Sequence, residues 1–255
     1  MKNAGVDWMI SSFELFKSNA VSAAYEGSQK DRIVSIQFPE FDLRARKVIS
    51  RSNAKATGKW PSWKTGRSMH YESGNERIAF KLLDACHEVI SYSEQPCVIH
   101  YLMNGKICRH FPDILVKFLG HQELWEVKTA DESKASEIVQ RTGLMTRCLH
   151  TFGYQYQLIN VENLRNTNQL KSLDLVLNHG RQPVALIELE QIRQLFLRSN
   201  SLPWSYFQFG APGAAYKKQI CRLILEGLLE MDKRDVLEED TKIKYNHGNG
   251  GKPWL

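Results

Sequence analysis

The sequence predicts an α/β protein in which helices flank a mixed sheet, followed by a smaller domain of helices and a β-ribbon. Three observations lead to this prediction: a helical pattern over residues 76–89, a group of strand-like runs between residues 96 and 128, and alternating helix and strand patterns after it. With 255 residues, of which 42% are hydrophobic, the chain is long enough to bury a core in one large or two small domains. A fibrous or disordered protein is therefore excluded.

The N-terminal part of the chain is distinguished by its charge. Residues 1–40 show a short amphipathic helix pattern over residues 8–16 and then no regular pattern. Although the whole chain has a net charge of +6, eight basic residues and no acidic one fall within a single run: Arg44, Arg46, Lys47, Arg51, Lys55, Lys59, Lys64 and Arg67. Trp60 and Trp63 interleave with them. This mixture suits contact with a phosphate backbone, so the eight residues and Trp60 are candidate DNA-binding residues. The alternatives are a solvated basic linker and, for the two tryptophans, a place in the core.

Residues 76–89 are expected to form a helix with one buried face, because six apolar residues recur there at helical spacing. Strand-like runs follow at residues 96–103 and 106–111, and the Asn104-Gly105 pair between them is a strong signal for a β-hairpin. Residues 113–118 and 124–128 continue as strands. The sequence thus places several antiparallel strands behind one helix.

The rest of the first domain alternates between helix and strand. A helix is expected over residues 131–150, a strand over 154–161 and a helix over 166–177. In the simplest interpretation, Glu137 and Arg141 form an exposed i,i+4 pair on the first of these helices.

Residues 178–183 form the predicted domain boundary. A helix over 184–197, an uncharged connection over 202–212 and a helix over 214–229 should follow, and two short strands at 229–231 and 241–245 complete the chain. The order helix, turn, helix, ribbon is typical of a winged-helix domain.

The composition excludes several other classes of protein. The longest uncharged stretch, residues 199–216, contains two prolines and two glycines and cannot form a membrane span. Asp7 and Glu14 interrupt the apolar run near the N-terminus, so we expect no signal peptide and a cytoplasmic location. The five cysteines show no Cys-x-x-Cys spacing, which favours packed, reduced thiols such as Cys86 and Cys97. The chain carries no phosphate-binding loop for ATP.

Two strands carry the candidate catalytic residues. Asp113 and Glu126 are separated by a strand, a tight turn and the return strand, which should bring the two carboxylates side by side. Alternation places Glu126 and Lys128 on the same face of the second strand. Two carboxylates and a main-chain carbonyl such as that of Val127 make an oxygen-rich pocket suited to Mg²⁺, and Lys128 can orient water or balance charge. The alternative is an edge strand with an exposed Glu-Lys pair.

A third acid, Glu76, should come from the helix that precedes the strands. Ser73 and Glu76 have the spacing of a capping box, in which Glu76 reaches back to the Ser73 amide. Glu76 also shares a helix face with apolar residues that must look toward the sheet. Its carboxylate can therefore lie at the sheet edge near Asp113, as a third metal ligand.

Five short blocks occur in order along the chain: PSWKTGR at residues 61–67, HYESGNE at 70–76, YSEQP at 92–96, FPDILV at 111–116 and EVK at 126–128. Together they resemble the TnsA endonuclease of heteromeric transposons. The resemblance implies a restriction-endonuclease-like fold. On this basis residues 1–60 are an N-terminal extension with the basic segment, residues 61–180 the endonuclease domain, and residues 181–255 a winged-helix-like domain.

The same resemblance implies a function and partners. The chain would be a Mg²⁺-dependent endonuclease subunit, with Mn²⁺ as a substitute, that cuts the 5′ ends of the transposon by phosphodiester hydrolysis while the transposase TnsB acts on the 3′ ends. Its catalytic residues would be Glu76, Asp113, Glu126 and Lys128, although some family members carry Gln where Glu126 stands. The ATPase regulator TnsC would be a second partner, and the acidic segment 226–240 suits a protein contact better than DNA. In a bacterial cell the protein would join the nucleoid within this complex.

Two other functions stay open at this point. One is a stand-alone restriction-like or junction-resolving nuclease, which the residues around Asp113 do not exclude. The other is a non-enzymatic winged-helix DNA-binding regulator in which the carboxylates are structural. The first would cut DNA without a transposase, and the second would bind DNA without any dependence on metal.

Overall fold

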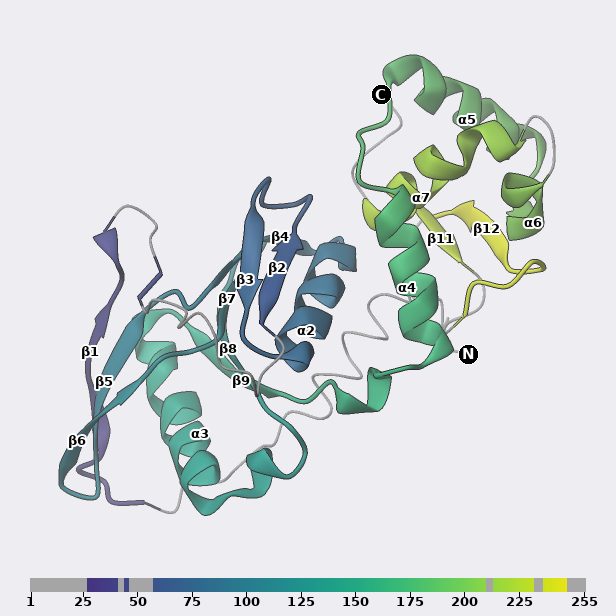
Figure 1. The fold of residues 1–255 in the computed structure, drawn as a ribbon. Coiled ribbons are helices and arrows are strands. Elements are labelled where there is room, and N and C mark those ends of the chain that lie inside the picture. The colour runs from purple at the N-terminus through teal and green to yellow at the C-terminus, as the bar shows by residue number, and fades with distance from the viewer. Residues whose placement is uncertain (1–26, 41–43, 46–56, 210–212, 232–235, 247–255) are drawn as a thin grey trace, which may run out of the picture. The chain divides into compact units, whose positions relative to one another are not determined.

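The structure is a computed structural model that describes residues 27–40, 44–45, 57–209, 213–231 and 236–246. The predicted helix at 8–16 lies outside these residues. The described chain divides near residue 164 into two compact units, with residues 84–87 grouped with the C-terminal one. Each unit contains helices and its own sheets, so the prediction of an α/β protein is confirmed (Figure 1).

A four-stranded mixed sheet forms the centre of the first unit. Its order is β4-β7-β8-β9, made of β4 (Val89–Glu94), β7 (Ile114–Phe118), β8 (Gln122–Val127) and β9 (Gln155–Ile159). The first three strands are antiparallel, whereas β9 runs parallel to β8. A parallel neighbour requires a crossover, which is supplied by the short 3-10 helix η2 (Glu132–Lys134) and helix α3 (Ser136–Leu149).

A second sheet has the order β1-β5-β6, with β1 (Arg32–Gln37), β5 (Val98–Met103) and β6 (Lys106–His110). The predicted hairpin joins β5 to β6, and positive φ angles at Asn104 and Gly105 give the turn the twist that antiparallel strands favour. Ile99 of this sheet shares one core with Leu115 and Leu124 of the central sheet and with Leu144 of α3. The sequence did not predict β1, which lies where no regular pattern was found.

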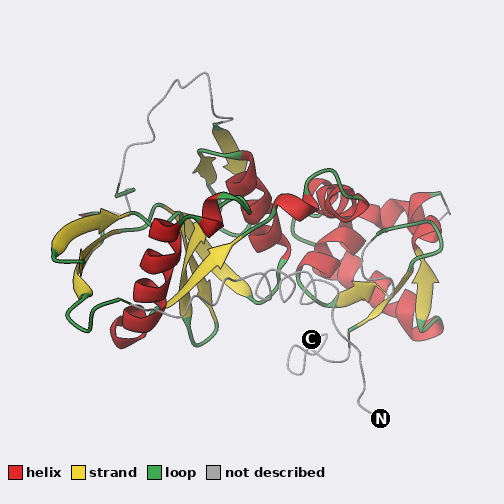
Figure 2. Cartoon of the chain, turned by 90° about the horizontal axis from the view of Figure 1, so that it is seen from below, coloured by secondary structure: helices red, strands yellow, loops and turns green. Residues whose placement is uncertain are grey.

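Helix α2 (Gly74–Ala85) covers the other face of the central sheet (Figures 1 and 2). Its apolar face is buried as expected, and the ring centroid of Phe80 lies 5.5 Å from that of Tyr92 on β4. The predicted helix end at residue 89 is wrong, because Val89 already begins β4 and pairs with Phe118 of β7. A small hairpin of β2 (Gly58–Pro61) and β3 (Ser68–Tyr71) precedes α2 and was also not predicted.

The C-terminal unit consists of helices and a three-stranded antiparallel sheet of order β10-β12-β11. Its elements are α4 (Asn168–His179), α5 (Leu186–Arg198), β10 (Ser201–Pro203), α6 (Trp204–Gln208), α7 (Lys217–Leu225), β11 (Leu229–Met231) and β12 (Lys242–Tyr245). The uncharged connection predicted at 202–212 contains helix α6 and most of strand β10. Trp204 and Phe207 are completely buried, which explains why helix α6 forms within an uncharged stretch.

Helix α4 packs against α7 within this unit, although the sequence placed α4 before the domain boundary at 180. The domain boundaries stay a prediction. Cys86 and Cys97 are buried, which confirms their interpretation as packed thiols. Within the described ranges, no helix is both long enough and apolar enough to cross a membrane.

Candidate functional site

The carboxylate of Asp113 lies beside the end of β8. Asp113 stands directly before β7, where its amide donates to the carbonyl oxygen of Trp125 at 2.8 Å. Its Oδ2 accepts the amide of Val127 at 2.7 Å. Both hydrogen bonds come from the backbone, so the register of two adjacent strands fixes the position of this carboxylate.

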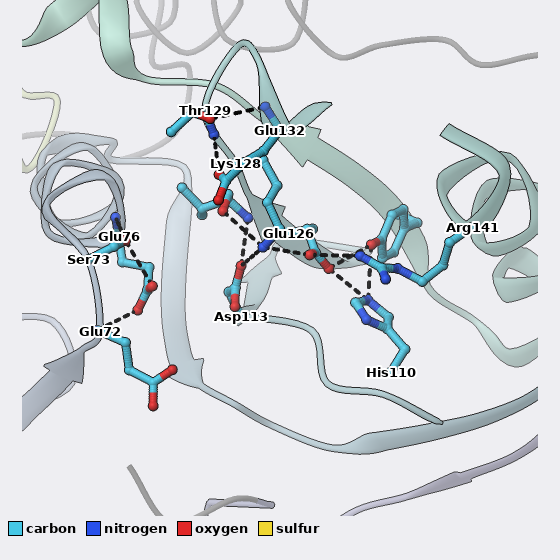
Figure 3. A network of polar contacts seen from close by, with 12 residues as sticks. Glu72, Ser73, Glu76, His110, Asp113, Glu126, Lys128, Thr129, Glu132 and Arg141 are labelled. Atoms are coloured by element: carbon cyan, nitrogen blue, oxygen red, sulfur yellow. Dashed lines mark hydrogen bonds and ion pairs between the residues drawn. The ribbon is translucent and has the colours of Figure 1, made fainter. Parts of the chain in front are cut away.

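Lys128 projects from the end of β8 into the same site (Figure 3). Its Nζ lies 2.7 Å from Oε1 of Glu126, 3.9 Å from Oδ2 of Asp113 and 3.4 Å from the carbonyl oxygen of Val127. The prediction that Glu126 and Lys128 share a face of the strand is confirmed. One ammonium group therefore lies between two carboxylates and a main-chain carbonyl.

Glu126 is held by three further side chains that the sequence did not indicate. Nη2 of Arg141, on α3, lies 3.0 Å from its Oε1, and Nε2 of His110 lies 3.0 Å from its Oε2. The hydroxyl of Tyr156, on β9, donates to the same Oε2 at 3.2 Å. The predicted pair between Glu137 and Arg141 is wrong, because the guanidinium turns inward to a buried charge that needs a partner.

These contacts set the charges in the site. Burial alone would raise the pKa of Glu126, but the hydrogen bond with His110, together with the charges of Lys128 and Arg141, holds that pKa well below its usual range. Burial would likewise lower the pKa of Lys128, yet the charges of Asp113 and Glu126 outweigh it and raise that pKa. Glu126 is therefore a carboxylate and Lys128 an ammonium over the physiological range.

The pKa of Asp113, unlike that of Glu126, is raised. Burial, and next the negative charge of Glu126, raise its pKa to about 8, and Glu76 adds to the repulsion. The side chain nevertheless keeps 19% of its surface exposed. An ionised Asp113 is thus under-compensated by the charges of the chain, which is the condition that a bound cation relieves.

Glu76 lies at the start of α2 and is used as a helix cap. Its carboxylate accepts the amide of Glu72 at 2.8 Å and the hydroxyl of Ser73 at 2.9 Å, while its own amide donates to that hydroxyl at 3.1 Å. The predicted contact with the Ser73 amide is wrong, since the carboxylate reaches one residue further back. Burial and, more weakly, the charge of Glu72 raise the pKa of Glu76.

The donor set fits a divalent cation at Asp113 but not at Glu126 as it stands. Among the described residues, the side-chain contacts of Asp113 fall on Oδ2, and the carbonyl of Val127 adds a second hard oxygen. Both oxygens of Glu126 are already engaged by cationic or hydrogen-bonding side chains. No group of three or more Asp, Glu, His or Cys side chains among the described residues is arranged to hold a metal ion.

The structure describes only some of the predicted DNA-binding residues. Arg46, Lys47, Arg51 and Lys55 lie outside the described residues. Trp60 is buried, with 7% of its surface exposed, which favours the core over a DNA contact. Lys64 is tied to the sheet, because its Nζ donates to the carbonyl oxygen of Val89 at 2.7 Å. Lys59, Arg67 and Arg44 belong to a separate cluster that is described below.

The segment that contains Asp113, Glu126 and Lys128 lies within a match to a known family. Residues 86–165 match the TnsA-like endonuclease N terminal family. The match spans β4 to β9 and includes Asp113, Glu126 and Lys128, whereas Glu76 lies before it. It confirms the resemblance to TnsA-type endonucleases, and the family implies a nuclease, which is a hydrolase. No curated protein matches the chain.

Proposed function

We propose that this chain is a Mg²⁺-dependent DNA endonuclease subunit that hydrolyses a phosphodiester bond at each 5′ end of a transposon. The observation that carries the proposal is the meeting of Asp113 and Lys128 at neighbouring strand ends, inside the segment that matches the TnsA-like family. The products would be a 5′-phosphate and a 3′-hydroxyl group.

Asp113 and the carbonyl of Val127 are the groups that would hold Mg²⁺, with Mn²⁺ as a substitute. Glu76 could join them only by giving up the Glu72 amide or the Ser73 hydroxyl, which now occupy its two oxygens. A bound ion would polarise the scissile phosphate and lower the pKa of a bound water. Glu126 could join as a ligand only by giving up Lys128 or Arg141, which now occupy its Oε1. In the arrangement described, its role is to orient these two cations.

Lys128 supplies positive charge where negative charge develops on the phosphate. Its raised pKa keeps it an ammonium, so it acts as a hydrogen-bond donor to a phosphate oxygen or to the attacking water, and not as a general base. Glu126 fixes its position at 2.7 Å. A donor that is held before the substrate arrives needs little reorganisation during the reaction.

The C-terminal unit supports the proposal of a winged-helix-like domain. Its order of α5, β10, α6, α7, β11 and β12, with the last strand in the middle of the sheet, is a helical bundle followed by a ribbon. We propose that the chain acts with the transposase TnsB and the ATPase regulator TnsC, and that the acidic segment 226–240 contributes to a protein contact.

The proposal is tested by cleavage of a duplex that carries a transposon end, with and without TnsB and TnsC. The wild-type chain should nick the 5′ end in Mg²⁺ or Mn²⁺, and Ca²⁺ should support binding but little cutting. Asp113→Asn and Lys128→Ala should each reduce the rate of cleavage by about a hundredfold or more. Asp131→Asn is a matched control, because that side chain is 98% exposed.

The outcomes separate the alternatives. Cutting at full rate without either partner would favour a stand-alone nuclease. Binding of DNA without cutting in any metal would favour a regulator. Unchanged cleavage in Asp113→Asn would remove this residue from the mechanism.

A further inference from the structure

A second charged cluster surrounds Glu94 at the end of β4. Glu94 is buried, with only 2% of its side chain exposed. Nη1 of Arg67 donates to its Oε1 at 3.0 Å and Nη2 donates to its Oε2 at 2.7 Å. Nε of Arg44 lies 3.6 Å from the same Oε1. The amide of His70 donates to the same oxygen at 3.3 Å. One buried carboxylate thus organises two arginines and a strand of the β2–β3 hairpin.

The cations of this cluster face outward although their anion is buried. The side chain of Arg67 is 45% exposed and that of Arg44 is 29% exposed. A guanidinium has five N–H groups. The two hydrogen bonds to Glu94 use one N–H group on each Nη atom of Arg67, so N–H donors remain for a second anion. Each arginine can therefore bind a ligand without releasing Glu94.

The cluster carries more positive charge than the buried acid requires. One bidentate arginine already balances Glu94, yet Arg44 is added to it, and Lys59 stands opposite His70 in the β2–β3 pairing. Burial first, and next the charges of Arg44 and Lys59, lower the pKa of His70, as a region of positive potential does. If the arginines served only to neutralise Glu94, this additional positive charge would not be needed.

A continuous path of backbone hydrogen bonds joins this cluster to the acidic site. The amide of Ala45 donates to the carbonyl of Gln95 at 3.0 Å, and the amide of Gln95 donates to the carbonyl of Asp113 at 2.8 Å. In the sheet register, Glu94 pairs with Ile114, the residue after Asp113. The alternation of side chains places Glu94 and Asp113 on opposite faces of the same strand ends. The arginines that contact Glu94 therefore lie at the same strand ends as Asp113 but on the other face of the sheet.

We propose that Arg67, Arg44 and Lys59 form a phosphate-binding subsite that holds the DNA backbone beside Asp113, and that Glu94 is the positioning residue of this subsite. This inference rests on the proposed function, because it takes duplex DNA as the ligand. The N–H groups of Arg67 that do not bind Glu94 would contact a phosphate of the same duplex. The YSEQP block, which contains Glu94, thereby acquires a role that the catalytic residues do not explain.

The test measures equilibrium binding of the full chain to duplex DNA by fluorescence anisotropy, in EDTA so that no strand is cut, over a range of salt concentrations. Arg67→Gln should weaken binding by roughly fivefold to tenfold and reduce the slope of log affinity against log salt by about one. Arg67→Lys should recover the slope but not the full affinity, because an ammonium keeps the charge and loses the fork. Arg109→Gln is the control, since it removes one exposed charge from β6 of the same unit.

Glu94→Gln gives the sharpest discrimination, because two explanations predict changes of opposite sign. If only net charge mattered, the loss of an acid would tighten DNA binding. If Glu94 positions Arg67 and Arg44, its loss should weaken binding about threefold or more, as expected for a misplaced charged contact. A melting curve for each variant checks the fold, and Arg67→Gln serves as the decisive variant should Glu94→Gln unfold.

Tighter or unchanged binding by a folded Glu94→Gln, or equal behaviour of Arg67→Gln and Arg109→Gln, would overturn this inference. Both results leave the wild-type chain as a nuclease. Failure of the proposed function looks different, because the wild type itself would then neither bind nor cut DNA.

Discussion

Replacing Asp113 with Asn should reduce the rate of cleavage by about a hundredfold or more and at the same time make the protein more stable. The side chain accepts the amide of Val127 at 2.7 Å, and the amide oxygen of Asn can accept the same bond. Asn removes a negative charge that lies near Glu126 and that burial disfavours. An active site that is less stable than it could be is common where function needs strained charges.

The size and the pH dependence of this gain follow from the pKa of Asp113. It is raised to about 8 in the folded protein, against an unfolded value of about 3.9. Below both values the carboxyl is protonated in both states and costs nothing. As pH rises from about 4 to about 8, the unfolded chain ionises first, so the stability of the wild type falls. Four pKa units set an upper limit of about 5 kcal/mol, and solvent at the partly exposed side chain lowers the expected gain to about 1–3 kcal/mol.

The assay is thermal unfolding in EDTA, with wild type and variant compared at several pH values. Near pH 8 the variant should melt roughly 4–8 °C higher, and the difference should shrink to nothing near pH 4. Asp131→Asn, at an exposed position, should show no such trend. A variant that is less stable than wild type near pH 8, or a difference that does not change with pH, would refute the argument about the buried charge.

Two further substitutions test the packing around the site and in the C-terminal unit. Arg141→Met removes a guanidinium 3.0 Å from buried Glu126 and should cost about 2–4 kcal/mol in urea unfolding, whereas Arg193→Met, in an exposed pair, should leave the midpoint unchanged. Equal midpoints for the two variants would show that Glu126 does not need Arg141. Gly180→Ala should cost about 1–3 kcal/mol, because its Cβ would lie 2.8 Å from the backbone of Cys221, and a neutral result would mean that α4 and α7 shift apart freely.

Local sequence patterns were sufficient to predict the strands that carry the candidate residues Asp113, Glu126 and Lys128. Asn104-Gly105 specifies its hairpin through two positive φ angles, and the alternation of Glu126 and Lys128 is a property of any strand. These features depend on residues that are close in sequence. For the same reason the helix at residues 76–89 was found but extended too far, since the apolar residue Val89 satisfies both the helical pattern and the start of β4.

The surroundings of Glu126 could not be predicted in this way. His110, Arg141 and Tyr156 come from β6, α3 and β9, and they meet only when the crossover closes. For Arg141 the local pattern pointed to Glu137, which is a weak surface partner compared with a buried carboxylate. The signal that could have found Arg141 is the demand of a buried acid for a cation, and this demand appears only once the sheet is assembled.

The parallel pairing of β8 with β9 has a consequence for biosynthesis. Antiparallel β7 and β8 can join as soon as both leave the ribosome, but β9 must wait for the whole α3 crossover. A nascent chain that stops before residue 141 would thus expose Glu126 without its guanidinium. Assembly of the candidate site is thereby coupled to closure of the sheet, so an incomplete translation product should lack the contacts that hold Glu126.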